Sequence, residues 1–256
     1  MVCKRNELPQ LLANDKLALG LWCSLVSANA VETLTTVSYE WFLLDMEHTT
    51  ASLNDIVDQL RVLDASSSAG VVRPPCSDMV FIKRLLDAGV KNLLFPNIQS
   101  VQEATQIIKA TRYAPHGIRG VSVAGRAAEY GAQADYLKNA SKEIVIGIQL
   151  ETKKALNLIP ELASLPEISI LFFGPGDLSA DMELLGQPDH PEVRKAVISS
   201  IKETVSHNKT AGVLAPNLDA ANAYIAAGAR FVAIGSDLLC LRAHANHLLE
   251  QIKPIK

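Results

Sequence analysis

The sequence predicts an α/β fold of the TIM (β/α)8 barrel type, and three observations support this prediction. About eight short apolar runs recur along the chain, which is the number of strands that a closed barrel needs. Segments with helical spacing separate these runs, as parallel strands require. Polar and charged residues are concentrated directly after the runs, where α/β barrels carry their functional groups. The 256 residues fit one barrel domain, residues 1–256, without an internal repeat or a linker.

Each predicted strand is a mostly apolar run bounded by Gly, Pro or polar residues, which is typical of strands buried on both faces. In chain order we expect strands at Leu17–Trp22, Trp41–Leu44, Gly70–Val72, Asn92–Phe95, Ile144–Leu150, Ile168–Phe173, Ala211–Leu214 and Phe231–Ile234. The fifth and sixth runs are almost wholly apolar, and a carboxylate follows each of them, Glu151 and Asp177. These two acids are therefore expected at the carboxyl ends of neighbouring strands.

The connections between the runs are expected to be helical. In chain order the helices are predicted at Asn29–Thr36, Leu53–Ala65, Met79–Ala88, Val101–Thr111, Ala155–Leu165, Pro191–His207, Ala220–Ala227 and Leu238–Ile252. Ser52 or Asn54 can cap the second helix, and Gly89 ends the third. Asp237 is expected to cap the last helix. The connection Tyr113–Asp135 is long and irregular, and such loops in compact domains are often functional.

Composition excludes several classes of function. The net charge of −3 argues against nucleic acid as a partner, because binding to its backbone needs a clustered basic surface. No apolar run approaches the roughly 18 residues of a membrane span. The N-terminus lacks the apolar core of a signal peptide, so the cytoplasm is the expected location. Four scattered cysteines without a CxxC pair predict reduced, buried thiols rather than structural zinc.

In a closed barrel, the polar residues after the strands would meet at one end. This set is Trp22, Asp45, Glu47, His48, Arg73, Pro96, Gln149, Glu151, Asp177, Asn217 and Asp237. Glu151 and Asp177 would suit a hard divalent cation, since Mg²⁺ takes one or two carboxylates and leaves its other positions for water and substrate. Arg73 ends an apolar strand, and a buried guanidinium needs an anion, which can be a substrate carboxylate or an enolate oxygen. His48 can move a proton near neutral pH.

Each residue also has a simpler interpretation. Asp45 and Glu47 could be solvated loop residues, His48 a structural histidine and Asp177 a helix cap. No lysine is well placed for a Schiff-base aldolase. Cys23 and Cys76 lack an activating neighbour in the sequence, so we expect them to line the pocket rather than to act as nucleophiles. The pair His244 and His247 is expected on a solvated or interface face of the last helix. Taken together, the strand-end residues favour a site for a small 2-oxo acid, with backbone N–H groups at Gly176 and Asp177 available for its carboxylate.

Seven segments of the chain resemble the signature blocks of the HpcH/HpaI aldolases. They are GLW at 20–22, DMEH at 45–48, VVRPP at 71–75, IKRLLDAGV at 82–90, RYAPHGIRG at 112–120, IQLET at 148–152 and GPGDLSADM at 174–182. The resemblance covers nearly the whole chain in order. It implies a metal-dependent class II pyruvate aldolase, which reversibly cleaves a 4-hydroxy-2-oxo acid into pyruvate and an aldehyde through a metal-stabilised enolate.

The resemblance also implies residue roles. Glu151 and Asp177 match the ligands of a divalent metal ion, Mg²⁺, Mn²⁺ or Co²⁺. Arg73 matches the arginine at the pyruvate keto oxygen, and His48 matches the histidine of proton transfer. Asp87 matches an aspartate that pairs with this histidine from a neighbouring subunit. The residues that match the substrate pocket are Trp22, Gln149, Gly176, Asp177 and Leu214.

Members of this family are typically hexamers, trimers of dimers, that exchange the last helix between subunits. An apolar stripe suits either this exchange or burial on the chain's own barrel, and it consists of Leu238, Leu241, Ala245, Leu248, Leu249 and Ile252. Glu183 stands where the family commonly has glycine, in a loop expected to border the aldehyde pocket. The same barrel also hosts macrophomate-synthase-like enzymes that decarboxylate oxaloacetate, and acyl-CoA lyases. A sensor that binds a 2-oxo acid without catalysis is a further alternative.

Overall fold

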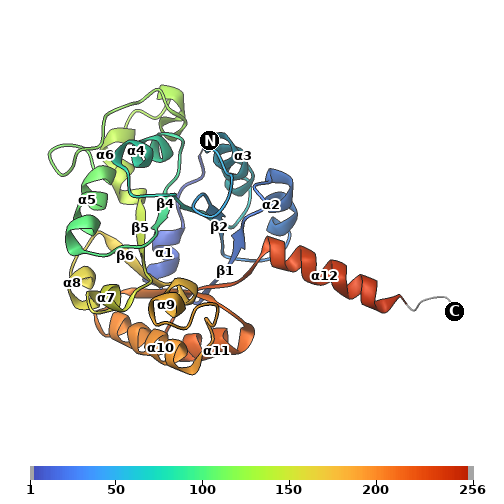
Figure 1. Ribbon diagram of the computed structural model, residues 1–256. Helices are drawn as coiled ribbons and strands as arrows, with labels where there is room; N and C mark the ends of the chain where they lie inside the picture. Colours follow the sequence, from blue (N-terminus) through green and yellow to red (C-terminus); the bar gives the residue numbers. More distant parts are fainter. Residues whose placement is uncertain (1–2, 253–256) are drawn as a thin grey trace.

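The computed structural model describes residues 3–252, and its eight parallel strands form the predicted closed barrel. The strands follow one another around the ring in chain order, with β8 hydrogen-bonded to β1. Helices surround the ring, as Figure 1 shows. The strands are β1 Ala18–Cys23, β2 Trp41–Asp45, β3 Ala69–Arg73, β4 Asn92–Phe95, β5 Val145–Leu150, β6 Ile168–Phe173, β7 Thr210–Ala215 and β8 Phe231–Ser236.

The interior of the barrel is filled by large side chains rather than open. The rings of Trp41 and Phe231 stack with centroids 3.8 Å apart, and Phe172 contacts Phe231 edge-on. Gly20 makes room for this stack, because a Cβ at that position would lie 2.1 Å from the Trp41 ring. An unpredicted helix, α1 (Leu8–Ala13), closes the amino-terminal end of the barrel by packing Leu8 into the same cluster. The packed interior leaves the carboxyl end of the barrel as the place for a site.

The outer layer consists of helices whose apolar faces cover the strands. The longer helices are α2 Ala28–Thr35, α3 Leu53–Asp64, α4 Met79–Asp87, α5 Val101–Thr111, α10 Pro191–Ser206, α11 Leu218–Ala226 and α12 Asp237–Gln251. Short helices lie in the connections: η1 Arg126–Gly131, α6 Tyr136–Asn139, η2 Ala140–Glu143, α7 Lys153–Leu156, α8 Ile159–Ala163 and α9 Pro175–Asp181. Helix α3 begins with a capping box of Ser52 and Asp55, in line with the predicted cap at Ser52.

Two details of the predicted helices were wrong. The helix expected over Ala155–Leu165 is divided into α7 and α8, because Pro160 has no N–H to donate to the carbonyl of Leu156. The last helix is capped by Ser236, whose hydroxyl accepts the N–H of Leu239. The neighbouring Asp237 instead accepts the backbone N–H groups of Ser24 and Leu25, at 2.9 and 3.0 Å, and so ties the start of α12 to the loop after β1.

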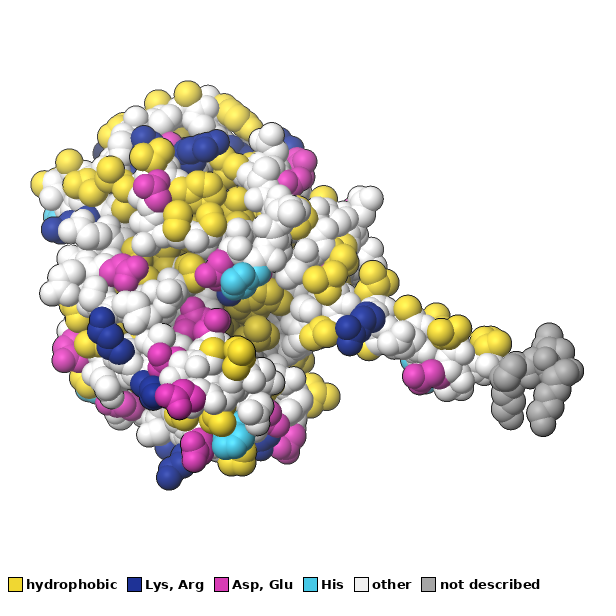
Figure 2. Space-filling view, in the orientation of Figure 1, with side chains coloured by type: hydrophobic (Ala, Val, Ile, Leu, Met, Phe, Trp, Pro, Cys, Tyr) yellow, Lys and Arg dark blue, Asp and Glu magenta, His cyan; other side chains and the backbone are white. Residues whose placement is uncertain are grey.

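Beyond Asp237 the described residues of helix α12 are all exposed, which excludes burial on its own barrel as the explanation for its apolar stripe. It projects away from the rest of the chain (Figure 1), and hydrophobic side chains lie along it in Figure 2. Leu241 is 61% exposed and Leu249 74% exposed. Within residues 3–252, no helix is both long enough and apolar enough to cross a membrane.

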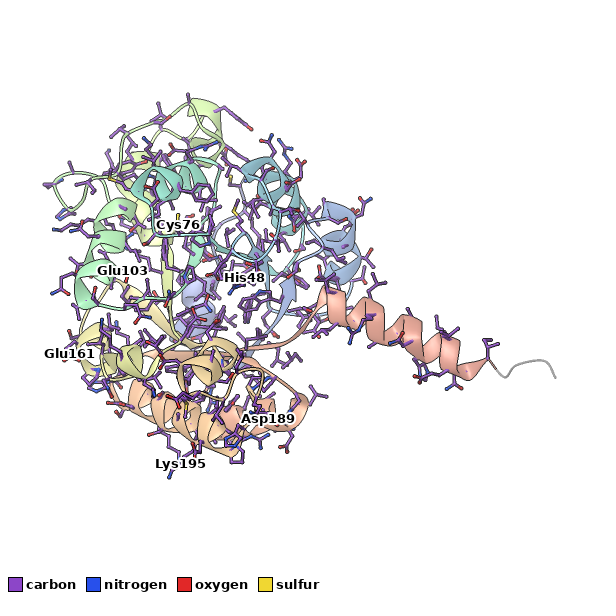
Figure 3. The ribbon with its side chains drawn as sticks, viewed as in Figure 1. His48, Cys76, Glu103, Glu161, Asp189 and Lys195 are labelled. Atoms are coloured by element: carbon purple, nitrogen blue, oxygen red, sulfur yellow. The ribbon has the colours of Figure 1, made fainter. Side chains whose placement is uncertain are left out.

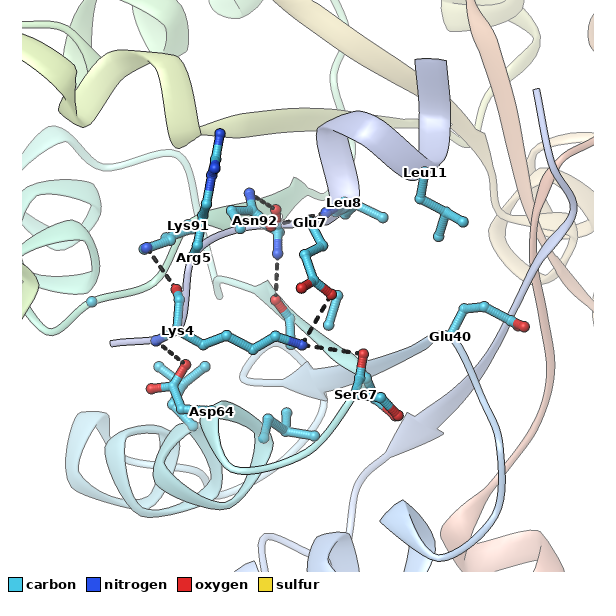
Figure 4. Close-up of a pocket in the computed structure, with 17 residues that line it drawn as sticks. Lys4, Arg5, Glu7, Leu8, Leu11, Glu40, Asp64, Ser67, Lys91 and Asn92 are labelled. Atoms are coloured by element: carbon cyan, nitrogen blue, oxygen red, sulfur yellow. Dashed lines mark hydrogen bonds and ion pairs between the residues drawn. The ribbon is translucent and has the colours of Figure 1, made fainter. Parts of the chain in front are cut away.

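A cavity of about 740 Å³ lies at the amino-terminal end of the barrel, beside the segment before α1 (Figure 4). The ammonium group of Lys4 is bound to Glu7 and to the carbonyls of Ser66 and Ser67. Lys91 donates to Glu143 and to the carbonyl of Lys4. These charged groups hold the N-terminal segment against the barrel, and their hydrogen bonds are already made.

Candidate active site

A cavity of about 660 Å³ opens at the carboxyl end of the strands. Every predicted site residue except Asp87 lines it. Its walls are formed by Trp22, His48, Arg73, Gln149, Glu151, Gly174, Pro175, Gly176, Asp177, Pro188, Leu214 and Pro216. His48 lies near the centre of the ring in Figure 3, and acidic side chains gather around the centre of this face in Figure 2. The structure therefore brings the two acids and the arginine together at one rim.

Arg73 is held in place by two carboxylates. Its Nε and Nη2 donate to the two oxygens of Asp45 at 2.9 and 2.7 Å, and Nη1 lies 2.9 Å from Glu47. The parallel register of β2 and β3 sets Asp45 directly beside Arg73, which explains the bidentate geometry. The guanidinium also lies over the Trp22 ring, 4.9 Å from its centroid. Arg73 is thus fixed in orientation at the edge of the cavity.

The two carboxylates beside Arg73 respond differently to burial. Burial alone would raise the pKa of Asp45, but the hydrogen bonds and charge of Arg73 outweigh it, so the pKa is lowered. The pKa of Glu47 is raised, because burial outweighs the opposing charges of Arg73 and His48. Asp45 is therefore the permanent counter-ion of the arginine. Glu47 also lies 3.7 Å from Nε2 of His48, whose side chain is 67% exposed.

Glu151 is a buried acid that has no cationic partner among residues 3–252. Only 4% of the residue is exposed, and its carboxylate accepts hydrogen bonds from the backbone N–H of Asn97 at 2.9 Å and from Gln149 at 3.3 Å. Burial, with the nearby Asp177 and Glu47 acting in the same direction, raises the pKa of Glu151 to about 8 against the lowering effect of the Asn97 N–H. Two neighbouring carboxylates, one of them buried with a raised pKa, are typical of a cation site.

Gly174 is required for the position of the Glu151 carboxylate. Strands β5 and β6 pair Leu150 with Phe173, so Glu151 and Gly174 are the next residues on neighbouring strands. A Cβ at position 174 would lie 2.4 Å from Oε2 of Glu151. The carboxylate therefore occupies space that any other residue at this position would fill.

The residues present fit a divalent cation of the Mg²⁺ type. Among residues 3–252, no three His, Cys, Asp or Glu side chains are grouped so that they could hold a metal. Glu151 and Asp177 are two carboxylates that line the same cavity, and two is a number that Mg²⁺ commonly takes when water and substrate complete its coordination. The carbonyl oxygen of the Gln149 side chain is buried in this wall and has no hydrogen-bond partner among these residues. It is free to bind a water or a substrate group.

A second cavity of about 670 Å³ shares part of the same wall. It is lined by Glu47, His48, Asn97, Glu151, Thr152, Asp177 and Asp181. The first cavity has an apolar wall of Trp22, Leu214 and three prolines, whereas the second is lined almost entirely by polar and acidic side chains. The acid pair Glu151 and Asp177 borders both.

Asp87 lies outside both cavities, at the end of α4. Its Oδ1 accepts a hydrogen bond at 2.9 Å from Arg119, a buried residue that also donates to the hydroxyl of Tyr136. The side chain of Asp87 remains 26% exposed. A role opposite His48 therefore depends on another subunit and stays a prediction.

Several sequence-based candidates do not reach the site. Neither cavity is lined by a lysine or a cysteine of the described chain. Burial raises the pKa of the Cys23 thiol, and Cys76 is exposed, so the expectation that these cysteines line the pocket was wrong. His244 and His247 lie on the exposed part of α12, with ring centroids 6.2 Å apart. Glu183 has a φ of +63°, a backbone conformation that favours glycine.

Sequence reasoning did not identify Gly174 as a site residue or Asp45 as the partner of Arg73. The signal for Asp45 was present, since Asp45 and Arg73 each end a predicted strand and these strands are consecutive. Gly174 carried no such signal, because its role depends on the register between β5 and β6. Pro188 and Pro216 come from two different loops, and their meeting in one wall depends on the folded arrangement of those loops.

Comparisons with known proteins agree with this geometry. The sequence profile of the HpcH/HpaI aldolase/citrate lyase family matches residues 18–243. A 5-keto-4-deoxy-D-glucarate aldolase of Enterobacter sp. (strain 638) is 38% identical to the chain over 248 residues, which is 97% of each protein.

Solved structures share the fold. An HpcH/HpaI aldolase/citrate lyase family protein from Burkholderia cenocepacia J2315 superposes with a TM-score of 0.91 at 34% identity, covering 96% of this chain and 98% of that chain. The citrate lyase beta subunit of M. tuberculosis, complexed with oxaloacetate and magnesium, is more distant. Its TM-score is 0.57 at 15% identity, over 90% of this chain and 95% of that chain, which shows the fold alone.

Proposed function

We propose that this chain, which belongs to the HpcH/HpaI aldolase/citrate lyase family, cleaves a 4-hydroxy-2-oxo acid reversibly into pyruvate and an aldehyde. The chain is a lyase of the class II aldolase type, and this class depends on a divalent metal ion. The observation that carries the proposal is the convergence of Glu151, Asp177 and Arg73 on one cavity.

The four free cysteines also support the predicted cytoplasmic location.

Glu151 and Asp177 are the residues that would hold the metal ion, Mg²⁺, Mn²⁺ or Co²⁺. When bound, such an ion supplies Lewis-acid polarisation of the keto group. The raised pKa of Glu151 supports this assignment, because a cation would relieve the repulsion between the acids that contributes to it.

Arg73 is proposed to stabilise the negative charge that develops on the keto oxygen of pyruvate. A guanidinium has five N–H donors. Three of them are directed at Asp45 and Glu47, which leaves two for a ligand in the cavity. Because Asp45 fixes the orientation of Arg73, these donors are preorganised, and preorganised donors give the largest stabilisation of a developing charge. Gln149, the backbone at Gly176, Trp22 and Leu214 are proposed to bind the rest of the keto acid.

His48 is proposed to move the proton that is gained or lost at the hydroxyl of the 4-hydroxy-2-oxo acid. Its imidazole borders both cavities, and its intrinsic pKa suits proton transfer near neutral pH. Asp87 of a neighbouring subunit is proposed to orient this imidazole. Arg119 would hold Asp87 for that contact, since it binds only one of the two carboxylate oxygens.

A contact between Asp87 of one subunit and His48 of another requires an oligomer. We propose that this oligomer is a hexamer built from dimers that exchange α12. The exposed stripe from Leu238 to Ile252 supports it, because a projecting helix with unburied leucines is stabilised by packing on a second copy. We expect Leu241→Glu together with Leu248→Glu to reduce the mass measured by light scattering during gel filtration. An unchanged mass would contradict the exchange.

The decisive test is pyruvate release from a panel of 4-hydroxy-2-oxo acids, measured on chelator-treated protein with and without added Mn²⁺. We expect release only with the metal, and no covalent trapping of pyruvate by borohydride. Activity after exhaustive chelation, or borohydride trapping, would replace this mechanism with a Schiff-base one. Decarboxylation of oxaloacetate without aldol cleavage would instead favour the macrophomate-synthase-like alternative.

A further inference from the structure

Two prolines in the wall of the first cavity come from loops that are well separated in the sequence. Pro188 belongs to the loop 182–190 after α9, and Pro216 directly follows β7. A proline has no backbone N–H group, so neither residue can donate a hydrogen bond that would fix it in the wall. The residue after each proline supplies the contact instead, because Nδ2 of Asn217 donates to Oδ2 of Asp189 at 2.8 Å. One hydrogen bond thus joins the two loops beside the cavity.

The side chains of this hydrogen bond are held from both sides. Oδ1 of Asp189 accepts from Nε and Nη2 of Arg194 on α10, at 2.9 and 2.7 Å, which leaves Oδ2 for Asn217. The side-chain oxygen of Asn217 accepts the N–H of Ala220 at 2.8 Å and caps α11, so its amide N–H is directed at Asp189. The hydrogen bonds from Asn217 and Arg194 lower the pKa of Asp189. Asp189 is therefore an ionised link between α10 and α11, on the side of the ring where Figure 3 labels it.

The loop 182–190 has few other contacts that could fix its position. Within residues 3–252, its remaining hydrogen bonds run inside the loop, to α9 or to α10. Leu185 in this loop is 81% exposed. A segment with few buried contacts opens at a low cost in free energy. The hydrogen bond between Asp189 and Asn217 therefore controls how often the two prolines lie together in the wall.

We propose that Asp189 is a positioning residue for substrate binding. Through its bond to Asn217 it keeps the wall of the first cavity closed. This inference rests on the proposed function, which assigns that cavity to the keto acid. The closed wall excludes water from the donors of Arg73, and electrostatic interactions are stronger where water is excluded. A substrate that binds the closed form has an apparent affinity reduced by the fraction of enzyme in that form.

The test uses exchange of the pyruvate methyl protons in D2O with Mn²⁺-loaded enzyme, followed over a range of pyruvate concentrations. In Asp189→Ala we expect KM to rise roughly threefold to tenfold, because the loss of one hydrogen bond shifts a loop equilibrium by about that factor. The wall is closed in the bound enzyme, so kcat should stay within about twofold. Asn217→Ser keeps an oxygen for the Ala220 N–H and removes the donor to Asp189. It should raise KM by a similar factor, and the double variant should raise KM no further.

The matched control is Asp219→Asn, which removes an acid that binds the same Arg194 at 2.8 Å but lies on α11. It should keep the wild-type KM. A purely structural role of Asp189 would lower Tm and leave KM unchanged well below Tm, and that result would overturn this inference alone. Additive effects in the double variant would overturn the route through Asn217. A lack of exchange in the wild type would remove the proposed function and this inference with it.

Discussion

Both ends of the barrel carry a cavity, one beside Lys4 and Lys91 at the amino-terminal end and one beside Arg73 and Glu151 at the carboxyl end. Charged groups line both cavities. The two lysines at the amino-terminal end have partners, whereas at the carboxyl end Arg73 is paired but the acids Glu151 and Asp177 have no cationic partner among residues 3–252. At the amino-terminal end, Lys4 and Lys91 bind carboxylates and backbone carbonyls. At the carboxyl end, Glu151 is buried beside another acid, and its pKa is raised to about 8.

This difference in charge balance favours the carboxyl-end cavity as the ligand site. Paired charges at the amino-terminal end hold a chain segment and gain nothing from a bound ion. The acid pair at the carboxyl end carries an electrostatic cost that only a cation or protons can relieve, and such costs are typical of functional sites. The balance of charge in the cavity wall therefore separates the two ends of the barrel.

Replacement of Arg73 is the strongest way to test this contrast. In Arg73→Lys a point charge remains, but it cannot bind Asp45 bidentately and still present free donors to the substrate. We expect kcat/KM for aldol cleavage to fall by roughly a hundredfold or more. The affinity for Mn²⁺, measured by calorimetry, should stay within about twofold.

The matched control is Arg230→Lys, which changes an arginine just before β8, at the opposite end of the barrel. It should retain wild-type kcat/KM. Full activity of Arg73→Lys would contradict the assignment of Arg73 to the developing charge.

Glu151→Gln should remove the unpaired buried charge and with it a pH dependence of stability. In the metal-free wild type, the folded protein keeps a proton on Glu151 up to about pH 8, whereas the unfolded chain loses it near the ordinary glutamate pKa. The folded state then binds more protons in this range, so stability falls as pH rises from about 4.5 to 8. Glu151→Gln should lack this decline.

Thermal unfolding in the presence of a chelator measures this effect. Each kcal/mol of lost stability corresponds to about 2–4 °C in Tm for a domain of this size. Added Mn²⁺ should raise Tm of the wild type more at pH 8 than at pH 6, because the ion binds the deprotonated acid. If Tm depended on pH in the same way in the wild type and in Glu151→Gln, folding would not raise the pKa of Glu151.

Gly174→Ala is expected to have a smaller effect, confined to the metal site. The added methyl would lie 2.4 Å from Oε2 of Glu151, so the carboxylate must move. Changes in the surroundings of a metal ligand commonly cost about tenfold to a hundredfold in affinity. Gly176→Ala is the control for metal affinity, because a Cβ there meets nothing within 4 Å. Equal Mn²⁺ affinity in the two variants would contradict the role of Gly174.

The sequence alone predicted the barrel and the convergence of the acids, because strand ends in a parallel barrel meet at one rim whatever the details of packing. Arg73 was predicted at that rim for the same reason. The contact between Gly174 and Glu151 was beyond such reasoning, since it depends on the register of two strands. The second cavity was also beyond it, because Asp181 enters this wall only through the short helix α9. Helix α1 was missed because its six residues are too short for a clear apolar period.

Replacement of Lys91 should have the smallest effect on activity. It tests the cavity at the amino-terminal end of the barrel, where the lysines are paired. Lys91 donates to the carbonyl of Lys4 at 2.8 Å and to the carboxylate of Glu143. Lys91→Met should lower stability by about 1 kcal/mol, the usual contribution of a partly exposed pair with one added hydrogen bond. Tm should fall by about 2–4 °C.

Because the charges at this end bind each other and not a ligand, kcat/KM of Lys91→Met measured well below Tm should equal that of the wild type. Lys195→Met is the control, since Lys195 is exposed at the outer edge of α10 (Figure 3) and should change neither quantity. A loss of activity in Lys91→Met at unchanged metal affinity would mean that the two ends of the barrel are coupled. The paired charges beside α1 would then act on the site through the packed interior and would not serve stability alone.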